Sequence, residues 1–387
     1  MLYFDHCAST PPHDEVIRTL AEVMKAHYAN PSSIHRAGTD ADKLVERSRQ
    51  LLAGAFGTKP EEWLFTSGGT ESNNLALKGA ARANRSRGNH IITTSVEHAS
   101  VYDACRQLEE EGFRVTYLPV NATGHVEPEE LRRALSDDTI LVSVMHVNNE
   151  VGSVQPIEAI GNVLKDRPKT LFHVDAVQSI GKLPIRIREW GIDLLSGSAH
   201  KLRGPKGTGF LYVREDVRIQ PLQSGGSQEH GMRAGTQNVP GIVASAKAFR
   251  MAMETAGKRY AAMASLRSRL LEHIRSIPEL KLNGSLPEEA GSYPMAPHIV
   301  HVSYPGMKPE VIVHMLEEEG IVVSTKSACS SKEDRPSRVL LAMGADRKHA
   351  SGGIRISFGD EHTERDIDRL ADGLRTVVKR LKPLERS

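Results

Sequence analysis

The sequence is short of cysteine, and that shortage excludes two classes of protein. Its 387 residues include three cysteines, Cys7, Cys105 and Cys329, which stand far apart without a CxxC spacing. A small secreted scaffold held by disulfides needs more of them, so the pattern is typical of a reduced, cytoplasmic protein. The chain likewise offers no cysteine ligand set for zinc or an iron–sulfur cluster, and we predict no bound metal.

Long hydrophobic runs and blocks of like charge are also missing. No run of about 18 apolar residues occurs, which excludes a transmembrane helix. The N-terminus lacks the basic and apolar regions of a secretory signal. Lysine and arginine number 50 against 48 aspartates and glutamates, a formal net charge of +2. We therefore expect neither a membrane nor a nucleic acid as a direct partner.

The composition is that of an ordinary globular protein, with 39% hydrophobic and 25% charged residues. A chain of this length can bury one large core and a second, smaller one. No internal repeat or low-complexity segment is present. We predict a large domain over residues 15–257 and a small domain formed by residues 1–14 together with 258–387.

Short β-rich runs alternate with helical patterns through the first part of the chain. The runs are nearly continuous in Val, Ile and Leu, which is typical of strands covered on both faces. Right-handed helical crossovers then give a wound α/β domain with a mostly parallel sheet. The predicted strands are residues 63–66, 90–93, 114–118, 140–145, 171–174, 194–196 and 209–213, and the predicted helices are 71–83, 100–111, 129–134 and 157–165.

A long helical region, residues 240–276, leads out of this domain. The remainder predicts a smaller α+β domain, which the extreme N-terminus can join. Its predicted strands are residues 281–282, 298–303, 321–324 and 353–357, and its predicted helices are 309–318, 337–343 and 364–381.

An aspartate and a lysine follow two of the predicted strands. Asp175 ends one apolar run, and Lys201 follows another, beside His200 and a Gly-Pro-Lys-Gly turn. Either residue alone is explained by a helix cap or a surface lysine. Together they suit pyridoxal phosphate (PLP) chemistry, in which the lysine amine forms a Schiff base and the aspartate keeps the pyridine nitrogen protonated.

Further polar residues follow other strands. Thr70, after two glycines, suits a phosphate oxygen or caps a helix. His98 suits stacking on a cofactor ring and acid–base work, or is a structural histidine. Asn149 suits the ring's phenolic oxygen or the substrate, or belongs to a turn. Because open α/β sheets bind ligands outside the carboxyl ends of their strands, these positions predict one site. Gln178, three residues after Asp175, can donate to the same phenolic oxygen.

Three residues extend the site beyond those strands. Arg355 lies in a β-rich stretch, where its guanidinium suits an amino-acid carboxylate or a structural ion pair. Thr236 lies in a Gly-flanked loop, and its hydroxyl can reach a phosphate either of its own chain or of a second subunit. Cys329 lies in a polar, charged segment beside Lys326 and Lys332, whose charges favour the nucleophilic thiolate. A non-functional exposed thiol is the alternative for Cys329.

These residues stand in motifs that resemble the NifS/IscS-like cysteine desulfurases of the class V aminotransferase family, which are fold-type I PLP enzymes. The resemblance runs nearly end to end and in order. It includes Asp5 with residues 8–10 (AST), 30–33 (NPSS) with His35, 66–73 (TSGGTESN), 97–98 (EH), 145–152 (MHVNNEVG), 173–179 (HVDAVQS), 198–201 (SAHK), 233–236 (RAGT), 327–330 (SACS) and 355–357 (RIS).

The resemblance implies a cytoplasmic homodimer that binds PLP and removes sulfur from L-cysteine. Cys329 attacks the substrate sulfur, which leaves L-alanine and an enzyme persulfide. An iron–sulfur scaffold, a tRNA thiolation enzyme or a thiamin pathway protein then accepts the sulfur. The implied roles are catalysis by Cys329, Lys201 and His98, ring contacts by His98, Asn149, Asp175 and Gln178, phosphate contacts by Gly69, Thr70, Ser198, His200 and Thr236 (the last across the dimer interface), and substrate contacts by Asn149 and Arg355.

The chain also departs from this family near its start. Cys7 occupies a position that is usually alanine, and we expect it to be a small packing residue. A selenocysteine lyase or another class V transaminase is a rival in chemistry, although a transaminase does not need Cys329. A non-catalytic scaffold with the same fold is a rival of another class, and it needs neither Lys201, Asp175 nor Cys329.

Overall fold

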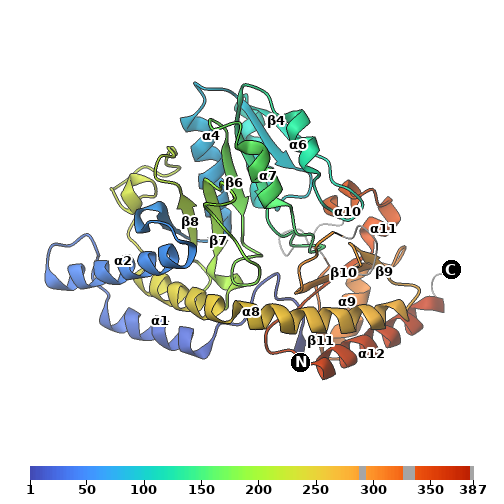
Figure 1. Cartoon of the computed structure of the whole chain (residues 1–387). Coiled ribbons are helices and arrows are strands. Elements are labelled where there is room, and N and C mark those ends of the chain that lie inside the picture. Colours follow the sequence, from blue (N-terminus) through green and yellow to red (C-terminus); the bar gives the residue numbers. More distant parts are fainter. Residues whose placement is uncertain (287–292, 326–335, 384–387) are drawn as a thin grey trace.

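The computed structural model describes residues 1–286, 293–325 and 336–383. Its larger sheet has seven strands, of which only β8 runs antiparallel to its neighbours. The predicted mostly parallel α/β sheet is therefore confirmed (Figure 1). In spatial order the strands are β2 (Trp63–Thr66), β8 (Gly209–Val213), β7 (Leu194–Ser198), β6 (Leu171–Asp175), β5 (Thr139–Met145), β3 (His90–Thr94) and β4 (Arg114–Leu118).

The strands of this sheet are apolar on both faces because a separate hydrophobic core covers each face. Successive residues such as Ile91 and Ile92, or Leu194 and Leu195, belong to opposite cores. Only the edge strand β4 has exposed or half-buried residues over most of its length. This alternation explains why the sequence runs are nearly continuous in hydrophobic residues.

Helices connect these strands and cover the sheet. The predicted helix 71–83 is a continuous helical run with a π segment in its middle, made of α3 (Gly69–Asn74), η2 (Leu75–Gly79) and α4 (Ala80–Ala83). Three helices were not predicted from the sequence, namely α1 (Asp14–Ala26), α2 (Arg36–Phe56) and α11 (Arg347–Ser351). The other connecting elements are α5 (Ala99–Glu110), α6 (Pro128–Ala134), α7 (Ile157–Leu164), and the short turns η1 (Pro60–Glu62), η3 (Ala199–Lys201) and η4 (Glu229–Gly231).

A second region is built on two small sheets with their own core. One sheet is antiparallel and has the order β12-β10-β9; the other pairs β1 with β11 in parallel, so the extreme N-terminus joins this region. The elements are β1 (Leu2–Tyr3), β9 (Lys281–Asn283), β10 (Ile299–Ser303), β11 (Ile321–Val322), β12 (Gly353–Ser357), α9 (Pro309–Glu318), α10 (Arg338–Ala342) and α12 (Glu364–Leu381).

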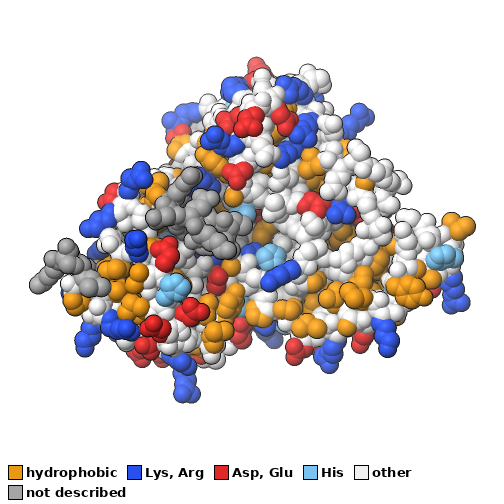
Figure 2. Space-filling model, turned by 180° about the vertical axis from the view of Figure 1, so that it is seen from behind, with side chains coloured by type: hydrophobic (Ala, Val, Ile, Leu, Met, Phe, Trp, Pro, Cys, Tyr) orange, Lys and Arg blue, Asp and Glu red, His pale blue; other side chains and the backbone are white. Residues whose placement is uncertain are grey.

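The long helix α8 (Val239–Arg275) runs beneath both regions (Figure 1). The predicted domain boundary at residue 257 falls inside it, and the division into residues 15–257 and the rest stays a prediction. No helix in the described ranges is long and apolar enough to cross a membrane. Figure 2 shows basic and acidic side chains interspersed over one face of the molecule, in keeping with the near-balanced charge.

Candidate active site

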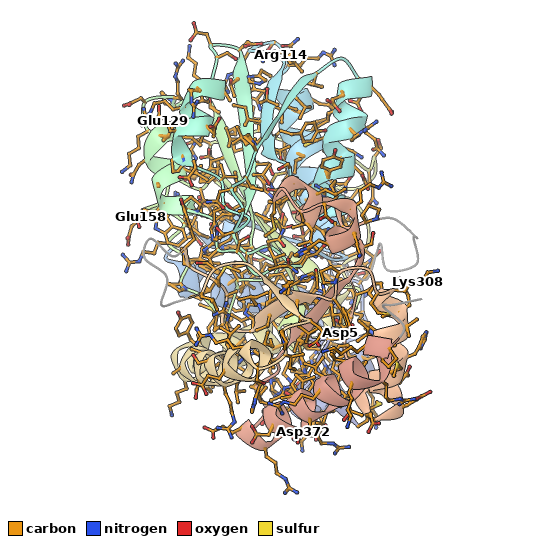
Figure 3. All side chains as sticks on the ribbon, turned by 90° about the vertical axis from the view of Figure 1, so that its right-hand side faces the viewer. Asp5, Arg114, Glu129, Glu158, Lys308 and Asp372 are labelled. Atoms are coloured by element: carbon orange, nitrogen blue, oxygen red, sulfur yellow. The ribbon has the colours of Figure 1, made fainter. Side chains whose placement is uncertain are left out.

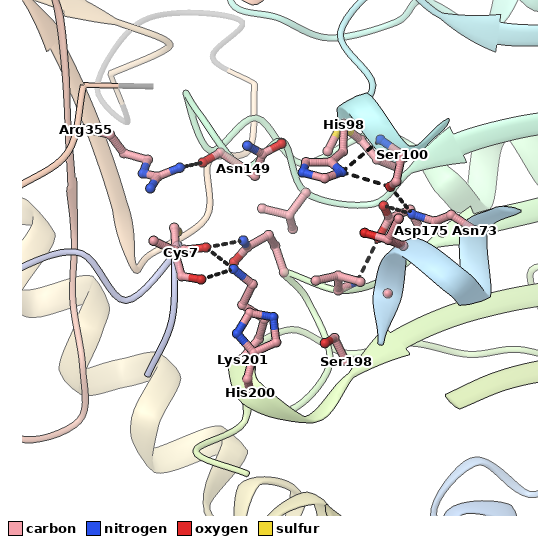
Figure 4. A pocket seen from close by; sticks show the side chains of 17 residues that line it. Cys7, Asn73, His98, Ser100, Asn149, Asp175, Ser198, His200, Lys201 and Arg355 are labelled. Carbon is pink, nitrogen blue, oxygen red and sulfur yellow. Dashed lines mark hydrogen bonds between the residues drawn. The ribbon is translucent and has the colours of Figure 1, made fainter. Parts of the chain in front are cut away.

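A pocket lies at the carboxyl ends of the large sheet and is closed on one side by β12 and the N-terminal segment (Figure 4). Most of the residues predicted as one site line it. Thr236 is exposed and is not among the lining residues, and Cys329 lies outside the described residues. The predicted residues that line the pocket are Gly69, Thr70, His98, Asn149, Asp175, Gln178, Ser198, His200, Lys201 and Arg355.

Asp175 is the last residue of β6, and both of its carboxylate oxygens are held. Oδ1 accepts from the backbone N–H of Val177 at 3.0 Å, and Oδ2 accepts from Nδ2 of Asn73 at 2.8 Å. The side chain is buried, with 5% exposure. A buried carboxylate is stable only when it is hydrogen-bonded in this way, so its direction is fixed before any ligand binds.

A short relay of hydrogen bonds connects Asp175 to His98. The amide Nδ2 of Asn73 also donates to Oγ of Ser100 at 2.8 Å, and that hydroxyl lies 2.8 Å from Nδ1 of His98. The backbone N–H of Ser100 contacts the same Nδ1 at 3.2 Å. Both contacts hold the imidazole by Nδ1 and therefore fix the orientation of the ring. Asn73 stands in the motif 66–73 and Ser100 begins the predicted helix 100–111, but neither was predicted to belong to the site.

Lys201 lies in the turn η3 that follows β7, and its amine faces the N-terminal segment. Nζ donates to the backbone oxygen of Ala8 at 2.7 Å and also to that of Cys7. Nε2 of Gln178 donates to the same oxygen of Cys7 at 3.0 Å. The carbonyl groups of residues 7 and 8 thus form a wall of the pocket. No side-chain pattern could have revealed this, because the groups belong to the backbone.

Arg355, on β12, brings the second region into the site. Its guanidinium is 1% exposed, pairs with Oδ1 of Asp5 at 2.7 Å through Nη2, and donates from Nη1 to the backbone oxygen of Asn149 at 2.9 Å. Its Nε has no hydrogen-bond partner in the part of the chain that the structure describes. The structural ion pair that the sequence suggested for Arg355 is therefore present, with Asp5 as the partner. Arg355 also lines the pocket.

Burial sets the charge of the site's histidines. It lowers the pKa of His98, against the opposing effect of the Asp175 carboxylate. It also lowers the pKa of His200 to about 4, and the positive charge of Lys201 adds to this effect. Both imidazoles are therefore neutral near pH 7 and can each offer one nitrogen as donor and the other as acceptor.

The fold and this pocket define an α/β enzyme whose ligand site lies at the strand ends of a mostly parallel sheet. The family model described as aminotransferase class-V matches residues 2–370. The chain is 43% identical over 381 residues to "Cysteine desulfurase IscS" of Methanosarcina thermophila, covering 98% of this chain and 93% of that protein. The chain belongs to the class-V aminotransferase family.

Solved structures agree with this assignment. A structure titled "NIFS-LIKE PROTEIN" superposes with a TM-score of 0.89 at 38% identity, covering 98% of this chain and 99% of that one. A structure titled "SspA in complex with cysteine" gives a TM-score of 0.80 at 35% identity, covering 92% of this chain and 99% of that one. The predicted resemblance to NifS/IscS-like proteins is therefore confirmed.

The pocket can be tested for its fit to PLP from its own polar atoms. The buried Oγ of Ser198 and Oε1 of Gln178 have no hydrogen-bond partner among the described residues. Buried polar atoms rarely stay unpaired, so both call for a polar ligand. A side chain at Gly69 would meet Cγ2 of Val177 at 2.8 Å, so only glycine leaves this wall open. With Asp175 and Lys201 present as well, the residues fit a phosphorylated pyridine aldehyde.

Proposed function

We propose that this chain is a PLP-dependent cysteine desulfurase that transfers sulfur from L-cysteine to a cysteine of its own. The observation that carries the proposal is the meeting of Lys201, Asp175 and Arg355 in one pocket. These residues supply an amine, a carboxylate and a guanidinium at the wall of a single cavity. The full-length relatives named cysteine desulfurase support the same activity.

The residues divide into those that hold the cofactor and those that hold the substrate. The amine of Lys201 would bind the aldehyde of PLP, Asp175 would face the ring nitrogen, and His98 would lie against the ring. Bound PLP supplies an electron-accepting ring that stabilises negative charge on an amino acid. Gln178 and Asn149 would contact the ring substituents, and the phosphate contacts would come from Gly69, Thr70, Ser198 and His200.

Arg355 and Asn149 would bind and orient the amino-acid substrate. A guanidinium matches a carboxylate with two parallel hydrogen bonds, and the unpartnered Nε of Arg355 leaves donor capacity for it. The Cys329 thiolate then attacks the substrate sulfur, and that sulfur leaves the substrate carbon. The products are L-alanine and a persulfide on Cys329, with a proton returned to the substrate carbon from Lys201 or His98.

The persulfide would leave on an acceptor protein. An iron–sulfur scaffold, a tRNA thiolation enzyme and a thiamin pathway protein are the proposed acceptors, and the enzyme would act as a cytoplasmic homodimer. Thr236 is exposed in the single chain, which suits a phosphate contact made across a dimer interface. Persulfide transfer from sulfur-labelled enzyme to each acceptor class identifies which acceptor it serves.

Two variants test the proposal. The purified protein should be yellow, and Lys201→Ala should lose the visible absorbance, because the amine that binds the aldehyde is gone. Cys329→Ser should keep the absorbance but abolish sulfide release from L-cysteine. Visible spectra and a sulfide assay with a thiol reductant measure the two effects.

Cys105→Ala serves as the matched control for the thiol variant. Cys105 is fully buried in α5, where burial raises the pKa of its thiol well above the usual range, so it is inert. Its replacement should leave sulfide release unchanged. Colourless protein even after PLP is added would overturn the cofactor assignment, and sulfide release by Cys329→Ser would overturn the persulfide step.

A further inference from the structure

Two histidines and a glutamate that the sequence places far apart meet beside the N-terminal wall of the pocket. His6 comes from the segment after β1, whereas Glu361 and His362 lie between β12 and α12. The ligand atoms of all three lie within 4.8 Å of one another. Nε2 of His6 is 2.9 Å from Oε1 of Glu361. His6 is 3% exposed, and its Nε2 has no partner in the described chain besides this carboxylate.

Neighbouring rings fix the orientation of both imidazoles. The ring of His362 stacks on Phe4 with a centroid distance of 4.2 Å and an interplanar angle of 21°. The ring of His6 meets His362 edge-on at 5.4 Å and Tyr3 edge-on at 5.2 Å. Side chains held in this way need little reorganisation to bind an ion.

The backbone of Gly359 holds the inner nitrogen of His362. Nδ1 accepts from the backbone N–H of Gly359 at 2.9 Å and lies 3.2 Å from the carbonyl oxygen of the same residue. A histidine that binds a metal through one nitrogen commonly donates the other N–H to a backbone carbonyl. In the ion-bound state Nδ1 would carry the proton and donate to this carbonyl, and Nε2 of His362 would then face the ion.

The charges around the cluster leave one oxygen of Glu361 available. Arg203 pairs with Asp360 at 2.9 Å and reaches only the other oxygen, Oε2, of Glu361, at 3.4 Å. Arg259 also approaches Asp360, at 3.7 Å. The positive charges of Arg203 and Arg259 are therefore balanced by the carboxylates of Asp360 and Glu361. Oε1 of Glu361 faces His6 rather than an arginine.

We propose that His6, Glu361 and His362 form a site for one divalent transition-metal ion of the zinc class. Two imidazole nitrogens and one carboxylate oxygen are a ligand set that zinc accepts, with water in the remaining position. The site goes beyond the proposed desulfurase activity and does not depend on it. The ion would connect His6 to the loop after β12 that carries Glu361 and His362. The carbonyls of the two residues after His6, Cys7 and Ala8, accept from Lys201.

The cysteine spacing alone predicted no bound metal. A site built from residues 6, 361 and 362 exists only in the folded chain. The simpler alternative is that His6 and Glu361 form an ion pair beside a stacked ring. That alternative predicts no zinc binding, so the two can be distinguished directly.

Equilibrium dialysis of the holoenzyme against zinc, followed by metal counting, tests the site. The measurement is made in a Cys329→Ser background so that this thiol cannot bind the metal. After chelator treatment, the protein should take up one zinc per chain. Glu361→Gln and His362→Gln should each weaken zinc binding by about tenfold or more, because each removes a ligand.

His314→Gln is the matched control. His314 forms an exposed pair with Glu317 at 3.6 Å on α9, so it provides a histidine and a carboxylate without a third ligand. This variant should keep full zinc binding. Visible absorbance of the holoenzyme confirms that each variant is folded. Failure to bind zinc, or equal binding by both ligand variants and the control, would overturn the site.

Discussion

Glu97 adjoins His98, and its carboxyl group is buried like that of Asp175 in the pocket. The two groups differ in their hydrogen bonds, because both oxygens of Asp175 accept one whereas one oxygen of Glu97 has none among the described residues. Oε1 of Glu97 accepts from the backbone N–H of Met145 at 2.9 Å and from the Thr94 hydroxyl at 2.8 Å. Oε2 has no hydrogen-bond partner within the described ranges. Burial raises the pKa of Glu97 from 4.5 to about 8. The carboxyl group is therefore protonated in the folded protein at neutral pH.

This protonation makes the stability of the protein depend on pH. Between pH 4.5 and about 8 the unfolded chain loses the Glu97 proton while the folded chain keeps it, so stability falls as pH rises. The slope is at most about 1.4 kcal/mol per pH unit. Glu97→Gln keeps an acceptor for Met145 and Thr94 and has no proton to lose. We expect its unfolding free energy, relative to the parent protein, to increase steadily across this window.

Urea unfolding of the two proteins at several pH values measures the difference. The control is Glu110→Gln, which removes an exposed carboxylate at the end of α5. The difference in unfolding free energy between Glu110→Gln and the parent protein should stay nearly constant with pH. A constant difference for Glu97→Gln as well would show that Glu97 ionises normally in the folded state.

At the scale of elements, Arg338 fastens α10 to the loop that carries His98. Its Nη1 donates to the backbone oxygen of Ser95 and its Nη2 to that of Glu97, while the guanidinium lies over the ring of Tyr102 at 3.9 Å. The preceding residue, Ser337, donates its hydroxyl to Oε2 of Glu150 at 2.6 Å. The helix α10, which follows the Cys329 segment in the chain, therefore contacts the two loops that carry the pocket residues His98 and Asn149.

Arg338→Ala should destabilise the protein by about 1–3 kcal/mol, because two partly buried carbonyls lose a charged donor. Arg338→Lys should restore only part of this, since one ammonium group cannot replace the planar fork. We also expect sulfide release to fall more than the visible absorbance does. Arg347→Ala, at an exposed position of α11, is the control. Equal losses of stability and of sulfide release in Arg338→Ala and Arg347→Ala would contradict the conclusion that Arg338 holds α10 against the loop of His98.

The elements that the sequence predicted well are those whose burial leaves a clear pattern. All seven strands of the large sheet were found, because strands buried on both faces require continuous apolar runs. The π segment η2 was missed, since one extra residue per turn barely alters helical periodicity. At the site, Asp175 and Lys201 were predicted because each of them follows an apolar run that is typical of a strand. The carbonyls of Cys7 and Ala8 reach Lys201 only through tertiary contact, about 190 residues along the chain.

At the scale of the whole molecule, the N-terminal segment joins the two regions of the fold. β1 pairs with β11 in the small region, and Asp5, seen in Figure 3 between the large sheet and α12, pairs with Arg355. The segment then continues to the turn that carries Lys201. There, the hydroxyl of Thr10 donates to the carbonyl oxygen of His200 at 2.6 Å and accepts from the backbone N–H of Arg203 at 2.9 Å.

Thr10→Val tests whether this connection holds the lysine turn in place. Valine keeps the shape of threonine but leaves the oxygen of His200 and the N–H of Arg203 without the hydroxyl. We expect a loss of about 1–3 kcal/mol in unfolding free energy. Because the turn is less firmly held, PLP should also dissociate faster on dialysis, as followed by visible absorbance.

Thr255→Val is the control for this loss, because the exposed Thr255 hydroxyl donates to the carbonyl of Met251 within the same helix, α8, at 2.8 Å. A drop in stability with unchanged cofactor retention would mean that Thr10 serves the fold alone. Faster loss of PLP at unchanged stability would mean that the hydroxyl acts on the lysine turn alone. Only the two losses together, absent in Thr255→Val, would show that the N-terminal segment couples the folding of the two regions to the site between them.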